Sequence, residues 1–149
     1  MARAFDLPTR RLREEATLPT YATMGSAGMD LYACLPDAKV HLEFGDRAII
    51  PTGIAVAIPM GFEGQVRPRS GLAAKHGVTV INAPGTVDSD YRGEVKVALV
   101  CLNRDGYTIK HGDRIAQMVI SGHARLPPRE VEDLGNTERG EGGFGSTGQ

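Results

Sequence analysis

The sequence lacks most of the features that mark exported and membrane-bound proteins. It has only two cysteines, Cys34 and Cys101. Both lie within apolar runs, so we expect reduced core residues rather than a disulfide framework. No stretch approaches the ~20 apolar residues of a membrane span, and residues 1–7 lack the apolar region of a secretory signal. These absences predict a soluble, cytoplasmic protein with no membrane partner.

The chain also lacks an excess of charge of either sign. Its 17 Lys and Arg residues oppose 18 Asp and Glu residues, which gives a formal net charge of -1. A protein that holds long stretches of nucleic acid needs an overall basic field, so no nucleic-acid partner is expected. Any anion must instead meet a local cluster. With 149 residues, the chain has the size of one ordinary domain.

Long helical stretches are the third absence. The 19 glycines and 9 prolines interrupt the sequence so often that the longest run free of both, residues 94–105, is too short for a helical bundle. Short apolar and alternating runs between these breakers predict an all-β sandwich, jelly roll or barrel. The predicted strands are Met29–Cys34, Val40–Phe44, Arg47–Pro51, Ile54–Ile58, Gln65–Arg67, Val78–Ile81, Val95–Leu102 and Arg114–Ile120.

One short helix and two arms complete the predicted organisation. The helix is expected over Ser70–Lys75, where Ser70 is placed to cap the first turn and Gly77 follows its end. In the strand Val95–Leu102 both faces are largely apolar, which predicts burial on both sides. The β domain is expected to span residues 1–137, with residues 1–18 as an exposed arm. Residues 138–149 hold five glycines and predict a flexible C-terminal arm.

Three clusters are suited to binding an anion, and the third is the segment Asn82–Glu94. Pro68–Gly71 brings a guanidinium, a hydroxyl and a glycine to the entrance of the short helix, where free backbone N–H groups favour a phosphate. A surface arginine beside an ordinary helix cap is the alternative. Arg139–Gly148 combines donors with glycines that let backbone approach a ligand, although a disordered tail has the same composition. Neither is a Walker loop, because the Lys-Ser/Thr after the final glycine is missing.

The segment Asn82–Glu94 is the most informative. Turn-forming residues flank an extended piece, Thr86–Asp88, whose backbone offers donors and acceptors to the edge of a base. Asp88 is expected at the edge of a pocket, where a carboxylate can accept a proton from water. The alternative is that Asp88 and Asp90 serve only as turn formers.

Two further polar residues interrupt apolar strands. The amide of Gln117 is expected either to bond the backbone or to face a ligand, because a buried amide needs partners. Asp30 is expected to pair with an arginine or to bind the water shell of a metal. A zinc site is not expected, because the four histidines are scattered and neither HExxH nor CxxC occurs.

In this order and spacing, five segments resemble the trimeric deoxyuridine triphosphatase (dUTPase) family, and the likeness runs from Pro19 to Gly148. The segments are AGMDLYA (27–33), PRSGLA (68–73), NAPGTVDSDYRGE (82–94), GDRIAQM (112–118) and RGEGGFGSTG (139–148). The resemblance implies a jelly-roll-like β subunit that forms a homotrimer, with each active site built from all three chains and closed by a donated C-terminal arm.

The resemblance also implies an activity. The protein would hydrolyse dUTP to dUMP and pyrophosphate, which limits uracil incorporation into DNA and supplies dUMP for thymidylate synthesis. Asp88 would be the general base that activates water for in-line attack on the α-phosphorus. Mg²⁺ would be the cofactor, held mainly by phosphates and waters, with Asp30 acting indirectly through water.

Matching positions imply how the substrate would be held. The implied substrate-binding residues are Arg69, Ser70, Gly71, Asn82, Thr86, Val87, Asp88, Tyr91, Lys96, Gln117, Arg139, Phe144, Gly145 and Ser146. Residues 69–71 and Gln117 resemble phosphate contacts, with Arg139 on the terminal phosphate. Asn82, the backbone of residues 86–88 and nearby Lys96 would read uracil.

Two aromatic residues would complete the implied substrate site. Tyr91 would pack under the deoxyribose and exclude a ribose 2'-hydroxyl. Phe144 would stack on the uracil when the arm closes.

Two alternatives stay open. A dCTP deaminase shares the fold and the phosphate pocket, but the DSDYRG run together with the aromatic, glycine-rich tail favours the pyrophosphatase. A non-catalytic nucleotide-sensing protein would use the same trimer. The intact Asp88 and Arg139 weigh against that second alternative.

Overall fold

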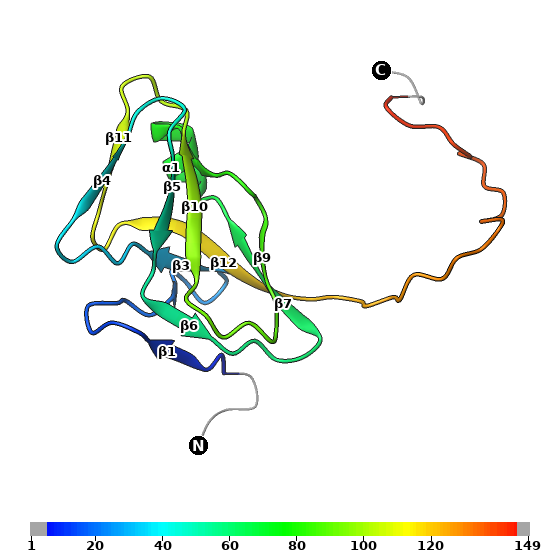
Figure 1. Ribbon diagram of the computed structural model, residues 1–149, viewed down its shortest axis with the longest axis horizontal. Helices are drawn as coiled ribbons and strands as arrows, with labels where there is room; N and C mark the ends of the chain where they lie inside the picture. The colour runs from blue at the N-terminus through cyan, green and yellow to red at the C-terminus, as the bar shows by residue number, and fades with distance from the viewer. Residues whose placement is uncertain (1–5, 146–149) are drawn as a thin grey trace.

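Alternating buried and exposed residues build two antiparallel sheets, shown in Figure 1. The computed structural model describes residues 6–145. The larger sheet contains, in spatial order, β2 (Thr20–Tyr21), β3 (Gly28–Tyr32), β12 (Arg114–Gly122), β7 (Phe62–Arg67) and β9 (Gly85–Val87). The smaller sheet contains β5 (Arg47–Pro51), β10 (Lys96–Cys101) and β8 (Val78–Val80). Two further strand pairs are separate from these sheets: β1 (Thr9–Arg11) pairs with β6 (Ile54–Val56), and β4 (Lys39–Leu42) pairs with β11 (Tyr107–Lys110).

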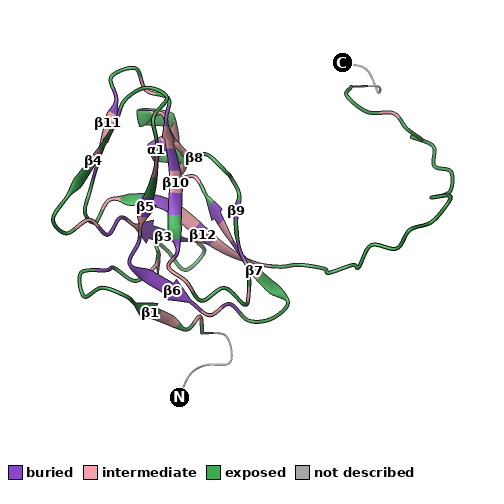
Figure 2. Cartoon of the chain, viewed as in Figure 1, coloured by how far each residue is buried: buried purple, intermediate pink, exposed green. Residues whose placement is uncertain are grey.

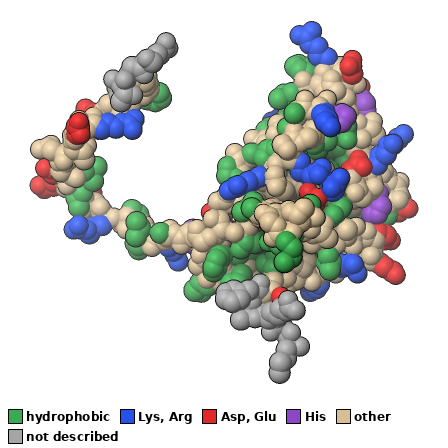
Figure 3. All heavy atoms as spheres, turned by 180° about the vertical axis from the view of Figure 1, so that it is seen from behind, with side chains coloured by type: hydrophobic (Ala, Val, Ile, Leu, Met, Phe, Trp, Pro, Cys, Tyr) green, Lys and Arg blue, Asp and Glu red, His purple; other side chains and the backbone are tan. Residues whose placement is uncertain are grey.

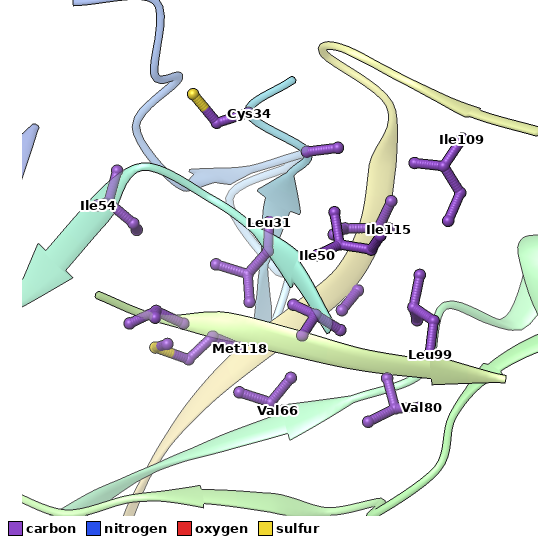
Figure 4. Packing of buried hydrophobic residues seen from close by; sticks show 14 of the residues in the cluster. Leu31, Cys34, Ile50, Ile54, Val66, Val80, Leu99, Ile109, Ile115 and Met118 are labelled. Carbon is purple, nitrogen blue, oxygen red and sulfur yellow. The ribbon is translucent and has the colours of Figure 1, made fainter. Parts of the chain in front are cut away.

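The hydrophobic core lies between the two sheets (Figure 4). Leu31 and Met118 point into it from the five-stranded sheet, and Ile50 and Leu99 meet them from the three-stranded sheet. All four side chains are at most 1% exposed, so their burial contributes to the hydrophobic effect that holds the sheets together. Cys34 and Cys101 are buried and free, which confirms the prediction of core thiols. Burial also raises the pKa of the Cys34 thiol.

The all-β fold with one short helix confirms the predicted class, and the sequence located its main strands. The helix α1 (Ser70–His76) ends at Gly77, whose left-handed φ of 62° allows its N–H to bond the carbonyls of Ala73 and Leu72. The predicted capping role of Ser70 is wrong. Arg69 occupies the N-cap position and its side chain makes no cap bond, so Ser70 is the first residue of the helix.

Three short strands escaped the sequence analysis. β1, β2 and β11 have two to four residues each, too few for an alternating pattern to stand out. β1 lies in the predicted N-terminal arm. Its residues are mostly exposed, but it pairs with β6 in antiparallel register, Thr9 opposite Val56. This part of the arm is therefore joined to the body of the fold.

Strand β10 differs from its prediction. Val97, Leu99 and Cys101 are fully buried, but Ala98 and Val100, which point the other way, are only half-buried. The prediction of burial on both sides is therefore wrong for a single chain. Ile49 on β5, opposite Ala98, is 69% exposed. The middle of the outer face of the three-stranded sheet is therefore apolar and uncovered in the described part of the chain, with the exposed residues Arg47 and Lys96 at its ends.

The C-terminal region leaves the body of the fold after β12 (Figures 1 and 2). Residues 123–145, called the arm below, are exposed except Gly142, which is intermediate. The sequence places the start of a flexible arm at residue 138, whereas regular structure already ends at Gly122. None of the helices in residues 6–145 is long and apolar enough to cross a membrane.

Candidate active site

A row of polar side chains crosses the outer face of the five-stranded sheet. Gln117 in β12 lies opposite Asp30 in β3 and opposite Arg67 in β7. Because opposite residues in neighbouring strands point to the same face, these three side chains lie side by side. Their neighbours Met29, Val66 and Met118 point inward and are buried.

This row lines a cavity of about 340 Å³, called the arginine pocket below. Its polar lining residues are Ser26, Asp30, Arg67, Arg69, Ser70, Arg114 and Gln117, and the glycines 28 and 71 also line it. Three guanidinium groups oppose one carboxylate, which leaves an excess of positive charge. Basic side chains gather on the face seen in Figure 3, with acidic ones between them. A concave site with excess positive charge attracts anions.

Asp30 fixes two of the arginines. Its Oδ1 accepts a bond from Arg69 Nε at 2.9 Å, and its Oδ2 accepts one from Arg114 Nη1 at 3.3 Å. Arg69 Nη1 also donates to the backbone oxygen of Arg114 at 3.3 Å. The side chains of Asp30 and Arg69 are 13% and 26% exposed, so this charge-assisted bond is partly shielded from water. The Arg114 side chain is more exposed. Of the two expectations for Asp30, the structure contains the pairing with arginine.

Of the two expectations for Gln117, the structure contains the bond to the backbone. Its Nε2 donates to the carbonyl of Pro68 at 2.8 Å, and its side chain also lines the arginine pocket. Pro68 is followed by Arg69, Ser70 and Gly71. The amide therefore anchors the loop that presents these three residues.

A second cavity, of about 420 Å³, lies at the segment 82–94 and is called the hairpin pocket. It is lined by Ile49, Thr86, Val87, Asp88, Tyr91, Glu94, Val95 and Lys96. Tyr91 Oη donates to the backbone oxygen of Glu94 at 2.9 Å, and Lys96 Nζ lies 3.8 Å from Glu94 Oε2. Glu94 thus bonds the ring through its backbone oxygen and attracts the exposed ammonium group through its carboxylate. Asp88 is exposed at the rim.

Strand β9 forms one wall of the hairpin pocket. Thr86 pairs with Gln65 of β7, and β9 is the last strand of its sheet. An edge strand presents unpaired backbone groups on its outer side. Asn82 is exposed and lines neither pocket. Its side chain packs on Gly85: a Cβ atom built on Gly85 would lie 3.2 Å from Asn82 Nδ2.

The predicted residues of the arm lie apart from both pockets. Arg139 Nε donates to the backbone oxygen of Gly142 at 2.8 Å, and Phe144 is fully exposed. Phe144 and Gly145 both have positive φ values, 49° and 85°. Ser146 lies outside the described residues. Within a single chain, the described residues of the predicted site are therefore divided among the arginine pocket, the hairpin pocket and the arm, with Asn82 outside all three.

Two arginines that line the arginine pocket, Arg67 and Arg114, were absent from the predicted site. Arg114 is three positions from Gln117, and in a regular strand that spacing would place them on opposite faces. A register shift between Arg114 and Ala116 allows Ile115 and Ala116 both to be buried while Arg114 and Gln117 line the same pocket. Arg114 stood in the quoted GDRIAQM segment, which was the available signal. Arg67 becomes visible only when the register with Gln117 is known.

The described residues offer little for direct metal ligation. Residues 6–145 contain no cluster of three or more His, Cys, Asp or Glu side chains that could hold a metal ion. Both oxygens of Asp30 are engaged by arginines. A divalent cation at this site would therefore need most of its oxygen ligands from a bound anion and from water.

Comparisons with known proteins agree over nearly the whole chain. The family model described as dUTPase matches residues 14–148. A deoxyuridine 5'-triphosphate nucleotidohydrolase from Caulobacter vibrioides is 62% identical over 132 residues, covering 88% of this chain and 85% of the relative. A protein of the same name from Syntrophotalea carbinolica is 53% identical, covering 95% of this chain and 96% of that relative.

Solved structures lead to the same family. The Staphylococcus bacteriophage 80alpha dUTPase with dUPNHPP has a TM-score of 0.88 and 28% identity, covering 98% of this chain and 100% of that one. A dUTPase from phage phi11 of S. aureus, described with a structural Mg(II) ion, has a TM-score of 0.78 and 25% identity, covering 87% of this chain and 98% of that one. The family match, the high identity and the shared fold together establish that this chain belongs to the dUTPase family.

Proposed function

We propose that this protein hydrolyses dUTP to dUMP and pyrophosphate, with Asp88 as the general base. The observation that carries the proposal is that the dUTPase match, residues 14–148, spans the arginine pocket, the hairpin pocket and the arm. A relative from bacteriophage 80alpha has been solved with the nucleotide analogue dUPNHPP, which supports dUTP as the substrate.

The arginine pocket is the proposed site of the triphosphate. Arg69, Ser70, Gly71 and Gln117 line it and would contact the phosphates. The arginines would neutralise the negative charge that repels an attacking oxygen, and their prior fixation by Asp30 reduces the reorganisation needed when substrate binds. Arg139 would add a cation on the terminal phosphate from the arm.

The hairpin pocket is the proposed site of the nucleoside. The free edge of β9 supplies backbone groups to uracil, with Asn82 and Lys96 nearby, and discrimination against cytosine follows from the order of donors and acceptors. Tyr91 would support the deoxyribose, and its bond to Glu94 keeps the ring in a fixed place. Phe144, with Gly145 and Ser146 beside it in the arm, would cover the base.

Asp88 would carry out the proton transfer. Its carboxylate accepts a proton from a water molecule as the water oxygen forms a bond to the α-phosphorus. The bond between the α-phosphorus and the bridging oxygen breaks, and that oxygen leaves with pyrophosphate. The exposed position of Asp88 at the rim of the hairpin pocket leaves room for this water.

Mg²⁺ is the proposed cofactor. The donor set fits an ion that takes most of its ligands from phosphate oxygens and water, with Asp30 acting through water while its salt bridges hold the arginines. When bound, the ion supplies further neutralisation of the triphosphate charge.

A homotrimer is the proposed assembly, with the two pockets and the arm of one active site coming from different copies. The apolar outer face of the three-stranded sheet, where Ile49 is 69% exposed, supports contact with another copy. A reducing, cytoplasmic location is supported by the free thiols of Cys34 and Cys101.

Pyrophosphate release by the purified full chain with Mg²⁺ tests the function, with dUTP, dCTP, dTTP and UTP offered separately. Release from dUTP alone is the expected result. Loss of ammonia from dCTP would identify a deaminase of the same fold. Binding of dUTP without turnover would identify a nucleotide sensor. A parallel measurement of molecular mass by light scattering tests the trimer.

A further inference from the structure

We propose that Gly28 is a positioning residue for this reaction, because it leaves open the space in which the Gln117 amide lies. The inference deepens the proposed function and rests on it in one respect, the role of Gln117 as a phosphate contact. Gly28 lies in the first of the five family-like segments but has no functional group of its own.

The sheet register brings the two residues together. Gly28 of β3 lies opposite Val119 of β12, while Gln117 lies opposite Asp30. Gly28 and Gln117 are therefore diagonal neighbours on the same outer face, within reach of a long side chain. A Cβ atom built on Gly28 would lie 2.2 Å from Gln117 Oε1 and 3.1 Å from its Cδ. Any side chain at position 28 would overlap the amide where it now lies.

The backbone conformation at position 28 does not require glycine. Gly28 is absent from the nine described glycines with positive φ, so an L-residue fits its backbone. Two nearby glycines show the contrast. A Cβ on Gly25 would meet nothing within 4 Å, and one on Gly64, on the buried face of β7, would lie 2.9 Å from Ile58 Cδ1. A Cβ on Gly64 would also lie 3.3 Å from Val87 Cβ. Gly28 alone among these three would direct a Cβ at the polar end of a predicted site residue, Gln117 Oε1.

The position of the Gln117 amide matters beyond its own contact with phosphate. Its Nε2 donates to Pro68 O at 2.8 Å, and Pro68 directly precedes the residues that present the triphosphate contacts. Displacing the amide would release the loop at this point. The absent side chain of Gly28 (segment 27–33) thus leaves room for the Gln117 amide (segment 112–118), which in turn bonds Pro68 (segment 68–73).

Alanine at position 28 should change the site without unfolding the protein. The atom that it would overlap most closely, Gln117 Oε1, is the far end of a flexible side chain, so the amide can rotate away. Gln117 Cβ, at 3.3 Å, needs only a small shift of the strand. The variant Gly28→Ala should therefore lose activity and keep its stability. At Gly64, by contrast, alanine would press on core atoms and lower stability.

The first test compares Gly28→Ala with the matched control Gly25→Ala in the full chain with Mg²⁺. We expect kcat/KM for dUTP to fall about tenfold in Gly28→Ala, the loss expected when a charge-assisted contact is misplaced. We expect Tm to stay within about 2 °C, because no core contact is removed. Gly25→Ala should match the unaltered protein in both. Unchanged kcat/KM in Gly28→Ala, or an equal loss in Gly25→Ala, would overturn the proposal.

A double-mutant cycle separates positioning from a general structural effect. If Gly28 acts through Gln117, adding Gly28→Ala to Gln117→Ala should cause no further loss of kcat/KM, because the overlapping amide is already gone. A second tenfold loss in the double variant would mean that Gly28 acts by another route, and would refute the proposal.

A crystal structure of Gly28→Ala provides a readout that does not depend on activity. Loss of the bond between Gln117 Nε2 and Pro68 O is the expected result, and an unmoved amide would contradict the inference. If the unaltered protein failed to hydrolyse dUTP, the proposed function would be wrong, whereas a displaced amide would still support the positioning role.

Discussion

The arginine pocket and the arm prepare their site residues in opposite ways. In the pocket, Arg69 is fixed by Asp30 at 2.9 Å and Gln117 by Pro68 at 2.8 Å before any ligand arrives. In the arm, the backbone N–H groups of Gly135, Gly140 and Gly142 bond residues only two or three positions away, and Phe144 is fully exposed.

The two regions differ in when they lose conformational entropy, during folding or during substrate binding. Side chains that are fixed during folding lose no further entropy when substrate binds, so their contacts act at full strength. In the proposed reaction, the arm would become ordered only when substrate binds, which would weaken affinity but allow substrate to enter and product to leave. Changes in the fixed part of the site should therefore alter both stability and activity, while changes in the arm should alter activity and leave stability unchanged.

The largest effect is expected at Asp88, which lies in a fixed pocket but contributes chemistry. Asp88→Asn removes the proton acceptor while keeping the shape of the side chain, so we expect kcat to fall by about 10³-fold with nucleotide binding largely intact. Asp90→Asn is the matched control in the same turn and should stay within about threefold of normal kcat. Equal effects in the two variants would mean that both residues are only turn formers. Steady-state kinetics and dUPNHPP binding provide the measurement.

Removal of residues 139–149 is expected to have the second largest effect. Because the described residues of this segment are mostly exposed, their loss should leave Tm within about 2 °C. We expect kcat/KM for dUTP to fall about 100-fold, since the base and terminal phosphate would lose their cover.

Two results would break the contrast between pocket and arm. Full activity of the shortened chain would show that the segment is merely a linker, and a large loss of Tm would show that it belongs to the stable fold. Arg139→Gln keeps the length of the arm and should reproduce part of the loss through the terminal phosphate.

Sequence reasoning succeeded where local pattern controls structure. The alternation in the long strands and the stop at Gly77 are properties of neighbouring residues, so they could be read directly. The short strands β1, β2 and β11 depend on partners elsewhere in the chain, and their few residues carry too little pattern.

The site shows the same division. Asp88 and Arg69 stand in recognisable segments, and their proposed roles stay predictions. Arg114 shares a face with Gln117 because of a local register shift, and Arg67 joins the pocket through pairing between β7 and β12. Neither relation exists in the sequence until the strands are paired.

The variant Asp30→Asn tests whether fixing the arginines of the pocket matters for both activity and stability. The amide keeps the size of the carboxylate but loses the charge that holds Arg69 and Arg114, so we expect kcat/KM to fall about tenfold and stability to fall by about 1 kcal/mol. A drop of about 3 °C in Tm should accompany the loss. Asp37→Asn, at an exposed loop position, is the control. Calorimetry and kinetics should move together; a loss of activity at unchanged Tm would argue that Asp30 acts on the substrate side rather than by fixing the arginines.

The smallest effect is expected at Arg67, at the outer end of the polar row. Its guanidinium bonds the side-chain oxygen of Gln65 and is exposed, so water and salt screen its attraction for an anion. Arg67→Gln should raise KM for dUTP about threefold with kcat unchanged, and the difference should shrink at high ionic strength. Arg104→Gln, in the exposed turn before β11, removes the same charge away from the pocket and should leave KM unaltered. A rise in KM of equal size in both variants would reflect the overall charge of the protein, and would remove Arg67 from the fixed part of the site.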